Sequence, residues 1–107
     1  MPTTQVGSHT VYYDDYGTGH PVLFMSGLGS TRLGWWKQVE PFSRRFRVIN
    51  MDNRDAGDSA LGTGPYTIAD MAQDTTAVIK NLNLGPTHII GISMGGMIAQ
   101  ELAIRYP

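Results

Sequence analysis

A serine flanked by glycines is the feature of this chain best suited to chemistry. Residues 91–96 read Gly-Ile-Ser-Met-Gly-Gly, after the largely apolar residues 88–90 and before the apolar residues 97–99. A serine hydroxyl is a useful nucleophile only when it is exposed, oriented and next to a base. A sharp turn from a strand into a helix exposes and orients it, so the pattern predicts that Ser93 is a nucleophile on such a turn.

The neighbours of Ser93 fit this interpretation. Bulky side chains would collide in so sharp a turn, which favours glycine at Gly91 and Gly95, and Gly96 extends the glycine-rich start of the helix. The N–H of Met94 directly follows the nucleophile at a helix N-terminus, where it can donate to the negative oxygen that develops during acyl transfer. The alternative is a glycine-rich helix start that only permits close packing.

The rest of the sequence predicts alternating strands and helices that position this turn. Strands are expected at residues 10–13, 22–25, 48–51 and 88–92, with a short strand before a turn at residues 7–8. Helices are expected over residues 35–46 as two pieces separated by Pro41, over 68–82, and from the turn to about residue 106. Thr67 with Asp70 resembles a capping box, and Gly85-Pro86 is a stop signal. This order indicates an α/β fold, a three-layer sandwich with a mostly parallel sheet of about five strands and three helices.

Composition narrows the class of protein. The 107 residues suffice for one compact domain, and they are 41% hydrophobic and 16% charged, as in ordinary globular proteins. The net charge of -1 gives no basis for binding nucleic acid or anionic lipid. The chain has no cysteine, and we expect neither a metal nor a cofactor. It shows no secretory signal and no membrane span, so a cytoplasmic protein is expected.

Two further loops carry a family resemblance. Residues 26–30 read Ser-Gly-Leu-Gly-Ser after the 22–25 strand, and residues 51–59 read Met-Asp-Asn-Arg-Asp-Ala-Gly-Asp-Ser. With the turn at Ser93, these segments make nearly the whole chain resemble the N-terminal half of an α/β-hydrolase. The resemblance is to single-domain esterases and lactonases, among them bacterial enol-lactone hydrolases. It implies a small ester or lactone substrate and an acyl-serine intermediate.

The resemblance also assigns roles to particular residues. It implies that the N–H of Leu28 is the second donor to the developing oxyanion, in a loop where Ser26 stands in place of the family's usual histidine. A plain tight turn is the alternative reading of this loop. The resemblance further implies that Asp52 and Arg54 form a charged pair that braces the floor of the site, a structural rather than a catalytic role.

The catalytic machinery is incomplete in this sequence. In the family order, an acid and then a histidine follow the nucleophile, but the residues after Ser93 contain neither aspartate nor histidine. His20 and His88 are expected at the far end of the sheet and His9 about three strands away, beyond hydrogen-bond reach of Ser93. We therefore expect residues 1–107 to be a partial domain without the C-terminal strands, lid, catalytic acid and histidine, and to be inactive or very weak alone.

Two functional hypotheses from different classes follow. The first is the nucleophile-bearing half of a serine hydrolase for an ester or lactone; perhydrolase, carbon–carbon hydrolase and acyltransferase activities share the serine turn and stay open. The second is a catalytically idle remnant or assembly module. In both, the 88–92 strand is an exposed edge, which predicts a homo-oligomer or a complementary C-terminal fragment as partner. Trp35, Trp36 and Met97 are expected in the core rather than in a pocket.

Overall fold

A single mixed sheet organises the chain. The computed structural model describes residues 3–7, 9–27, 30–59 and 66–106. The strands are β1 (Thr3–Val6), β2 (His9–Tyr16), β3 (Pro21–Met25), β4 (Arg47–Met51) and β5 (His88–Gly91). The helices are the short 3₁₀ helix η1 (Arg32–Trp35), α1 (Trp36–Ser43), α2 (Ile68–Asn81) and α3 (Met94–Arg105). The predicted five strands and three α-helices are therefore confirmed in the described part of the chain.

The sheet has the order β1-β2-β4-β3-β5. The pairings β4–β3 and β3–β5 are parallel, whereas β1–β2 and β2–β4 are antiparallel. The sheet is thus mixed rather than mostly parallel. The physical reason lies in the connections, because β1 and β2 are joined by a short turn that allows only an antiparallel pair, and parallel strands need a long crossover.

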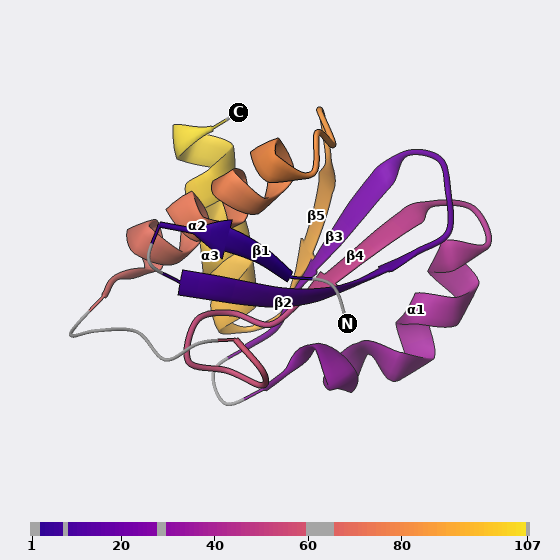
Figure 1. Cartoon of the computed structure of the whole chain (residues 1–107), viewed down its shortest axis with the longest axis horizontal. Helices are drawn as coiled ribbons and strands as arrows, with labels where there is room; N and C mark the ends of the chain where they lie inside the picture. The colour runs from indigo at the N-terminus through magenta and orange to yellow at the C-terminus, as the bar shows by residue number, and fades with distance from the viewer. Residues whose placement is uncertain (1–2, 8, 28–29, 60–65, 107) are drawn as a thin grey trace.

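Helices cover both faces of the sheet, as Figure 1 shows, with α1 on one side and α2 and α3 on the other. Alternate residues of each strand point to opposite faces. Leu23, Met25, Ile49 and Met51 pack in the cluster beneath α2 and α3. Val22, Phe24 and Val48 pack in the cluster beneath α1. Because the central strands β3 and β4 are buried on both faces, their sequences are almost continuously apolar. The three-layer prediction is confirmed.

The α1 side is closed by aromatic side chains. The Phe24 ring stacks on Trp35 with centroids 4.7 Å apart and meets Phe42 edge-on at 5.4 Å. The predicted break at Pro41 is wrong, because Pro41 lies inside α1 and the two helical pieces meet between Trp35 and Trp36. Lys37 and Pro41 are both exposed, so water can reach the Lys37 carbonyl that the missing proline N–H leaves without a helical donor.

Helix α2 begins and ends with recognisable caps. Thr67 Oγ1 accepts from the Asp70 N–H, and Asp70 accepts from the Thr67 N–H, which confirms the capping box. The helix ends before the Gly85-Pro86 signal, because Asn83 adopts a left-handed φ of 54°. The Leu84 N–H then donates to the Ile79 carbonyl over 3.1 Å, as in a Schellman cap. Across the residues with described positions, the helices all fall short of the length and apolarity that crossing a bilayer requires.

The capping box predicts an acid-sensitive contribution to stability. The hydrogen bond from the Thr67 N–H lowers the pKa of Asp70 below its ordinary value of 3.8. A depressed pKa means that the stabilisation is present above the ordinary pKa and is lost as the pH falls through the folded-state value. We expect Asp70→Asn to lower the midpoint of thermal unfolding at neutral pH and to lower it less at a pH well below 3.8. Equal shifts at both pH values would contradict the assignment.

Candidate active site

Ser93 lies on a strained turn between β5 and α3. Strand β5 ends at Gly91, α3 begins at Met94, and Ser93 is the N-cap with φ 55° and ψ -120°. A non-glycine residue rarely adopts this backbone conformation, which costs of order 1–3 kcal/mol and is concentrated at functional sites. The Ser93 residue is exposed. The turn therefore presents a hydroxyl to solvent at the end of a strand, as the sequence predicted.

The glycines around Ser93 differ in whether the turn has room for a side chain in their place. A methyl group on Gly91 would lie 2.3 Å from the Gly95 carbonyl oxygen, and one on Gly95 would lie 2.2 Å from the Met25 carbonyl oxygen. Both distances are far inside van der Waals contact, so the turn needs glycine at these positions. A methyl group on Gly96 would meet nothing closer than 3.8 Å, an ordinary contact. Gly96 is therefore not sterically required.

The loop after β3 lies against the turn. A methyl group on Gly27 would be 3.3 Å from Ser93 Cβ and 3.9 Å from the Met94 nitrogen. Met94 is the first residue of α3, where an N–H has no partner within the helix. The two segments predicted to supply oxyanion donors are thus neighbours, although Leu28 itself lies outside the described residues.

Ser26 and Asn53 hold the start of this loop. The Ser26 hydroxyl donates to the Thr31 carbonyl and accepts from Trp35 Nε1, each over 3.1 Å. Asn53 Nδ2 donates to the Ser26 carbonyl over 3.0 Å. Ser26 is buried, and so is Asn53. Ser26 therefore holds the start of the loop to Thr31 and Trp35.

Asp52 and Arg54 do not pair with each other, contrary to the expectation from the resemblance. The carboxylate of Asp52, fully buried, accepts from the backbone N–H and guanidinium of Arg32 and from the Asp58 N–H. Arg32 is also buried and donates to Asp14 and Asp58. Burial opposes the charge on Arg32, but the Asp58 hydrogen bond and the Asp52 and Asp14 charges outweigh it and raise its pKa. Asp52 therefore links the segment that contains Arg32 to the loop that contains Asp58.

Arg54 instead binds a helix. Its guanidinium makes two hydrogen bonds, 2.7 and 2.8 Å long, to Asp74 of α2 and lies 4.9 Å from the centroid of the Tyr66 ring. The Asp74 hydrogen bond raises the pKa of Arg54. Burial and a hydrogen bond to Asp55 raise the pKa of Tyr66. The sequence analysis did not single out Arg32 or Asp74. The one available signal was for Asp74, an acidic residue beside the apolar stripe of α2.

The histidines stay away from Ser93. The His20 and His88 rings lie 4.5 Å apart, and His88 faces Val22 at the start of the parallel β3–β5 pair. Ser93 follows the other end of β5. His9 begins β2, which is three places from β5 in the sheet. The two histidines whose side chains are described therefore sit at the opposite end of the sheet, as expected.

Two cavities flank the turn. One of about 230 Å³ is lined by Ser26, Trp35 and Ile92 among others, and one of about 180 Å³ by Gly27, Arg54 and Met94 among others. Trp35 therefore packs against Phe24 in the core and also lines one of these cavities. The expectation that Trp36 and Met97 belong to the core is wrong, because they are 70% and 50% exposed. In the described ranges, no three His, Cys, Asp or Glu side chains gather closely enough to hold a metal ion.

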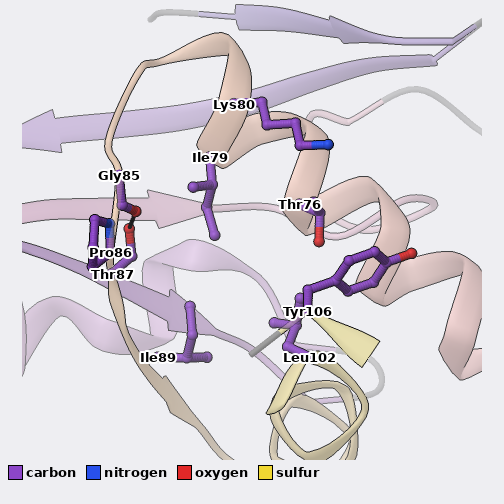
Figure 2. Close-up of a pocket in the computed structure, with 9 residues that line it drawn as sticks. All are labelled: Thr76, Ile79, Lys80, Gly85, Pro86, Thr87, Ile89, Leu102 and Tyr106. Carbon is purple, nitrogen blue, oxygen red and sulfur yellow. Dashed lines mark hydrogen bonds between the residues drawn. The ribbon is translucent and has the colours of Figure 1, made fainter. Parts of the chain in front are cut away.

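A further cavity, of about 410 Å³, lies between α2, α3 and the start of β5 (Figure 2). Ile79 and Ile89 point into it from α2 and β5, and Leu102 and Tyr106 line it from the end of α3. Leu102 is nine residues beyond Ser93 along α3, which corresponds to about 13 Å at 1.5 Å per residue. This cavity is therefore separate from the turn.

Comparison with known proteins identifies the family. A family model described as alpha/beta hydrolase fold matches residues 20–107. The chain belongs to this family. It is 34% identical over 107 residues to RutD of Azorhizobium caulinodans, covering 100% of this chain and 40% of RutD. It is 35% identical over 86 residues to 3-oxoadipate enol-lactonase 2 of Acinetobacter baylyi, covering 80% of this chain and 32% of that enzyme.

Solved structures of alpha/beta hydrolases superimpose closely on the chain. Est816, described as an N-acyl homoserine lactone degrading enzyme, matches with a TM-score of 0.95 and 33% identity over 99% of this chain and 41% of Est816. The enol-lactonase of Burkholderia xenovorans LB400 matches with a TM-score of 0.93 and 30% identity over 98% of this chain and 42% of that one. The chain thus spans about two fifths of the length of these relatives.

The two glycines after Ser93 provide a matched test of the turn. We expect Gly95→Ala to lower the free energy of unfolding by about 2 kcal/mol or more, because its methyl group would overlap the Met25 carbonyl. We expect Gly96→Ala to change it by no more than about 1 kcal/mol, since alanine is the better helix former and has room. Urea denaturation of both variants measures the difference. Equal effects would contradict the geometry.

The buried ion pair between Arg32 and Asp52 predicts that replacing Arg32 destabilises the protein more than replacing Arg47. We expect Arg32→Met to destabilise the protein by about 3–5 kcal/mol, because it leaves the Asp52 carboxylate buried without its cation. The control is Arg47→Met, which removes a partly exposed pair with Asp15 and is expected to cost about 1 kcal/mol or less. Denaturation curves of the two variants compare them, and a loss at Arg32 as small as at Arg47 would contradict the role of Asp52.

Proposed function

We propose that this chain is the nucleophile-bearing part of a serine hydrolase that acts on a small ester or lactone. The observation that carries the proposal is the strained, exposed backbone at Ser93, with φ 55°, directly beside Gly27. Backbone strain of this kind persists where function requires it. The likeness to an enol-lactonase and to a lactone-degrading enzyme supports the substrate class.

In the proposed reaction, Ser93 Oγ attacks the substrate carbonyl carbon while its proton passes to a general base. The carbonyl electron pair moves onto oxygen, and the N–H groups of Met94 and Leu28 stabilise that oxyanion. Collapse of the tetrahedral intermediate expels the alcohol, which takes up the proton, and leaves an acyl ester on Ser93. Water then attacks this ester, assisted by the same base, and releases the acid and the free hydroxyl.

The general base in this proposal is a histidine supplied from outside residues 1–107. His20 and His88, at the other end of the sheet, are unsuited to the role. A base needs hydrogen-bond reach, about 3 Å, to the proton that it takes. A complementary C-terminal segment or a second protein chain would bring the histidine and its carboxylate partner.

The β5 edge is the proposed place for such a partner. Within the described residues β5 pairs only with β3, so its other side offers unpaired backbone groups. Beside it lies the cavity of Figure 2, whose apolar residues include Ile89 and Leu102. A further strand, from a complementary fragment or another copy, would cover both. The same edge favours the second candidate function, an idle assembly module that associates without catalysis.

Labelling of Ser93 tests the proposal. We expect a fluorophosphonate probe to label the 107-residue chain slowly at Ser93, because the serine is oriented but lacks its base, and turnover of a short p-nitrophenyl ester to be very weak. Ser93→Ala should abolish labelling. Ser43→Ala, which changes a half-buried serine at the end of α1 that makes no predicted catalytic contact, should leave it unchanged. Peptide mass spectrometry locates the label.

The outcomes separate the two functions. Labelling that survives Ser93→Ala would contradict the nucleophile assignment. An unlabelled chain that sediments as an oligomer would favour the assembly module. Strong turnover would indicate a site completed between copies if the activity per chain rises with chain concentration and disappears in Ser93→Ala.

A further inference from the structure

Two histidines from neighbouring strands meet at the end of the sheet opposite Ser93. His20 directly precedes β3, and His88 begins β5. The two strands are parallel, with Val22 beside His88 in their register. Alternate residues of a strand share a face of the sheet, so His20 and Val22 point to the same side as His88. The two imidazole rings accordingly lie 4.5 Å apart, centroid to centroid.

Both imidazoles are open to a ligand. His20 and His88 are exposed, and within the described part of the chain neither ring takes part in a hydrogen bond or an ion pair. Their planes are inclined by 46°, so the rings are not stacked on each other. A neutral imidazole that makes no such bond keeps one nitrogen lone pair free. Two lone-pair donors therefore lie close together at this end of the sheet.

The separation of the rings fits two ligands of one metal ion. A histidine nitrogen binds a divalent ion at about 2.0–2.1 Å, which puts the ring centroid about 3.2 Å from that ion. Two rings at right angles about the ion then have centroids about 4.5 Å apart, and tetrahedral ligands about 5.2 Å. The observed 4.5 Å matches the right angle. Neighbouring ligands of a square-planar ion such as Cu²⁺ make that angle.

The nearby positive charges do not exclude a cation. Arg47 of β4 pairs with Asp15 over 2.8 Å, which neutralises its charge. It stands beside Pro21 in the β3–β4 register, and Pro21 points to the opposite face from its neighbour His20. Arg47 therefore points away from the two rings. Arg45 is exposed, so dissolved ions screen its charge.

We propose that His20 and His88 form a site for one divalent transition-metal ion, with Cu²⁺ preferred and water in the remaining coordination positions. Imidazole suits Cu²⁺ and Zn²⁺, Cu²⁺ binds more tightly than Zn²⁺, and Mg²⁺ prefers oxygen ligands. Two protein ligands are fewer than a structural metal centre uses, so the ion exchanges with solvent. When bound, it joins the edge strand β5 to β3 at the end away from Ser93. The site uses no residue of the Ser93 turn and does not rest on the proposed hydrolase function.

Calorimetric titration of the 107-residue chain with CuCl₂ tests the proposal. We expect one ion per chain with a Kd of about 10 μM or tighter, at least about fivefold weaker binding of ZnCl₂, and no binding of MgCl₂. His20→Gln and His88→Gln should each weaken Cu²⁺ binding at least about tenfold, because a single imidazole remains. The matched control is His9→Gln at the start of β2, three places from β5, which should leave the Kd unchanged.

A titration with diamagnetic Zn²⁺ identifies the ligands directly. We expect the nuclear magnetic resonance signals of the His20 and His88 rings to shift together and those of His9 to stay in place. Zn²⁺ should also raise the midpoint of thermal unfolding, because it binds the folded chain, and should do so much less in either single variant. Unchanged Cu²⁺ affinity in His20→Gln or His88→Gln, an equal loss in His9→Gln, or shifts confined to one ring would overturn the proposal.

Discussion

The close approach of α3 to the end of β3 is the constraint on which the rest of the site depends. The Met25 carbonyl accepts a hydrogen bond from the Ile92 N–H and leaves no room for a side chain on Gly95. This contact forces the chain to turn sharply between β5 and α3, and Ser93 absorbs the strain with a positive φ. A looser junction would allow an ordinary helix start and would bury or misdirect the hydroxyl.

Buried polar groups hold the loops that surround this turn. Asp52, at the end of β4, binds the Arg32 backbone and side chain and the Asp58 N–H, and Asn53 binds the Ser26 carbonyl. Losing one of these hydrogen bonds would lower the free energy of unfolding, because a buried polar group would be left unpaired. These hydrogen bonds hold the described loop residues next to the turn at Ser93, where backbone strain can be supported. The other end carries His20 and His88 and takes no part in the proposed chemistry.

Much of the fold and of the candidate site followed from the sequence. Apolar runs located the inner strands, the Thr67 and Asp70 pair located the start of α2, and the glycines around Ser93 located the turn. These features depend on residues close together in the chain, so a local pattern contains the information. The break at Pro41 was misplaced, because solvent exposure lets a short helix tolerate proline. The sequence analysis also did not predict the antiparallel pairings β1–β2 and β2–β4. Strand direction depends on which strands become neighbours in the sheet.

By itself, the sequence determined the kinds of element and the serine turn with its required glycines. Only the tertiary structure decided that Asp52 pairs with Arg32 and Arg54 with Asp74, and that Trp36 is exposed. The physical reason is distance along the chain. Side chains about twenty residues apart choose partners by where the sheet and helices bring them together, and by the need to pair each charge that becomes buried.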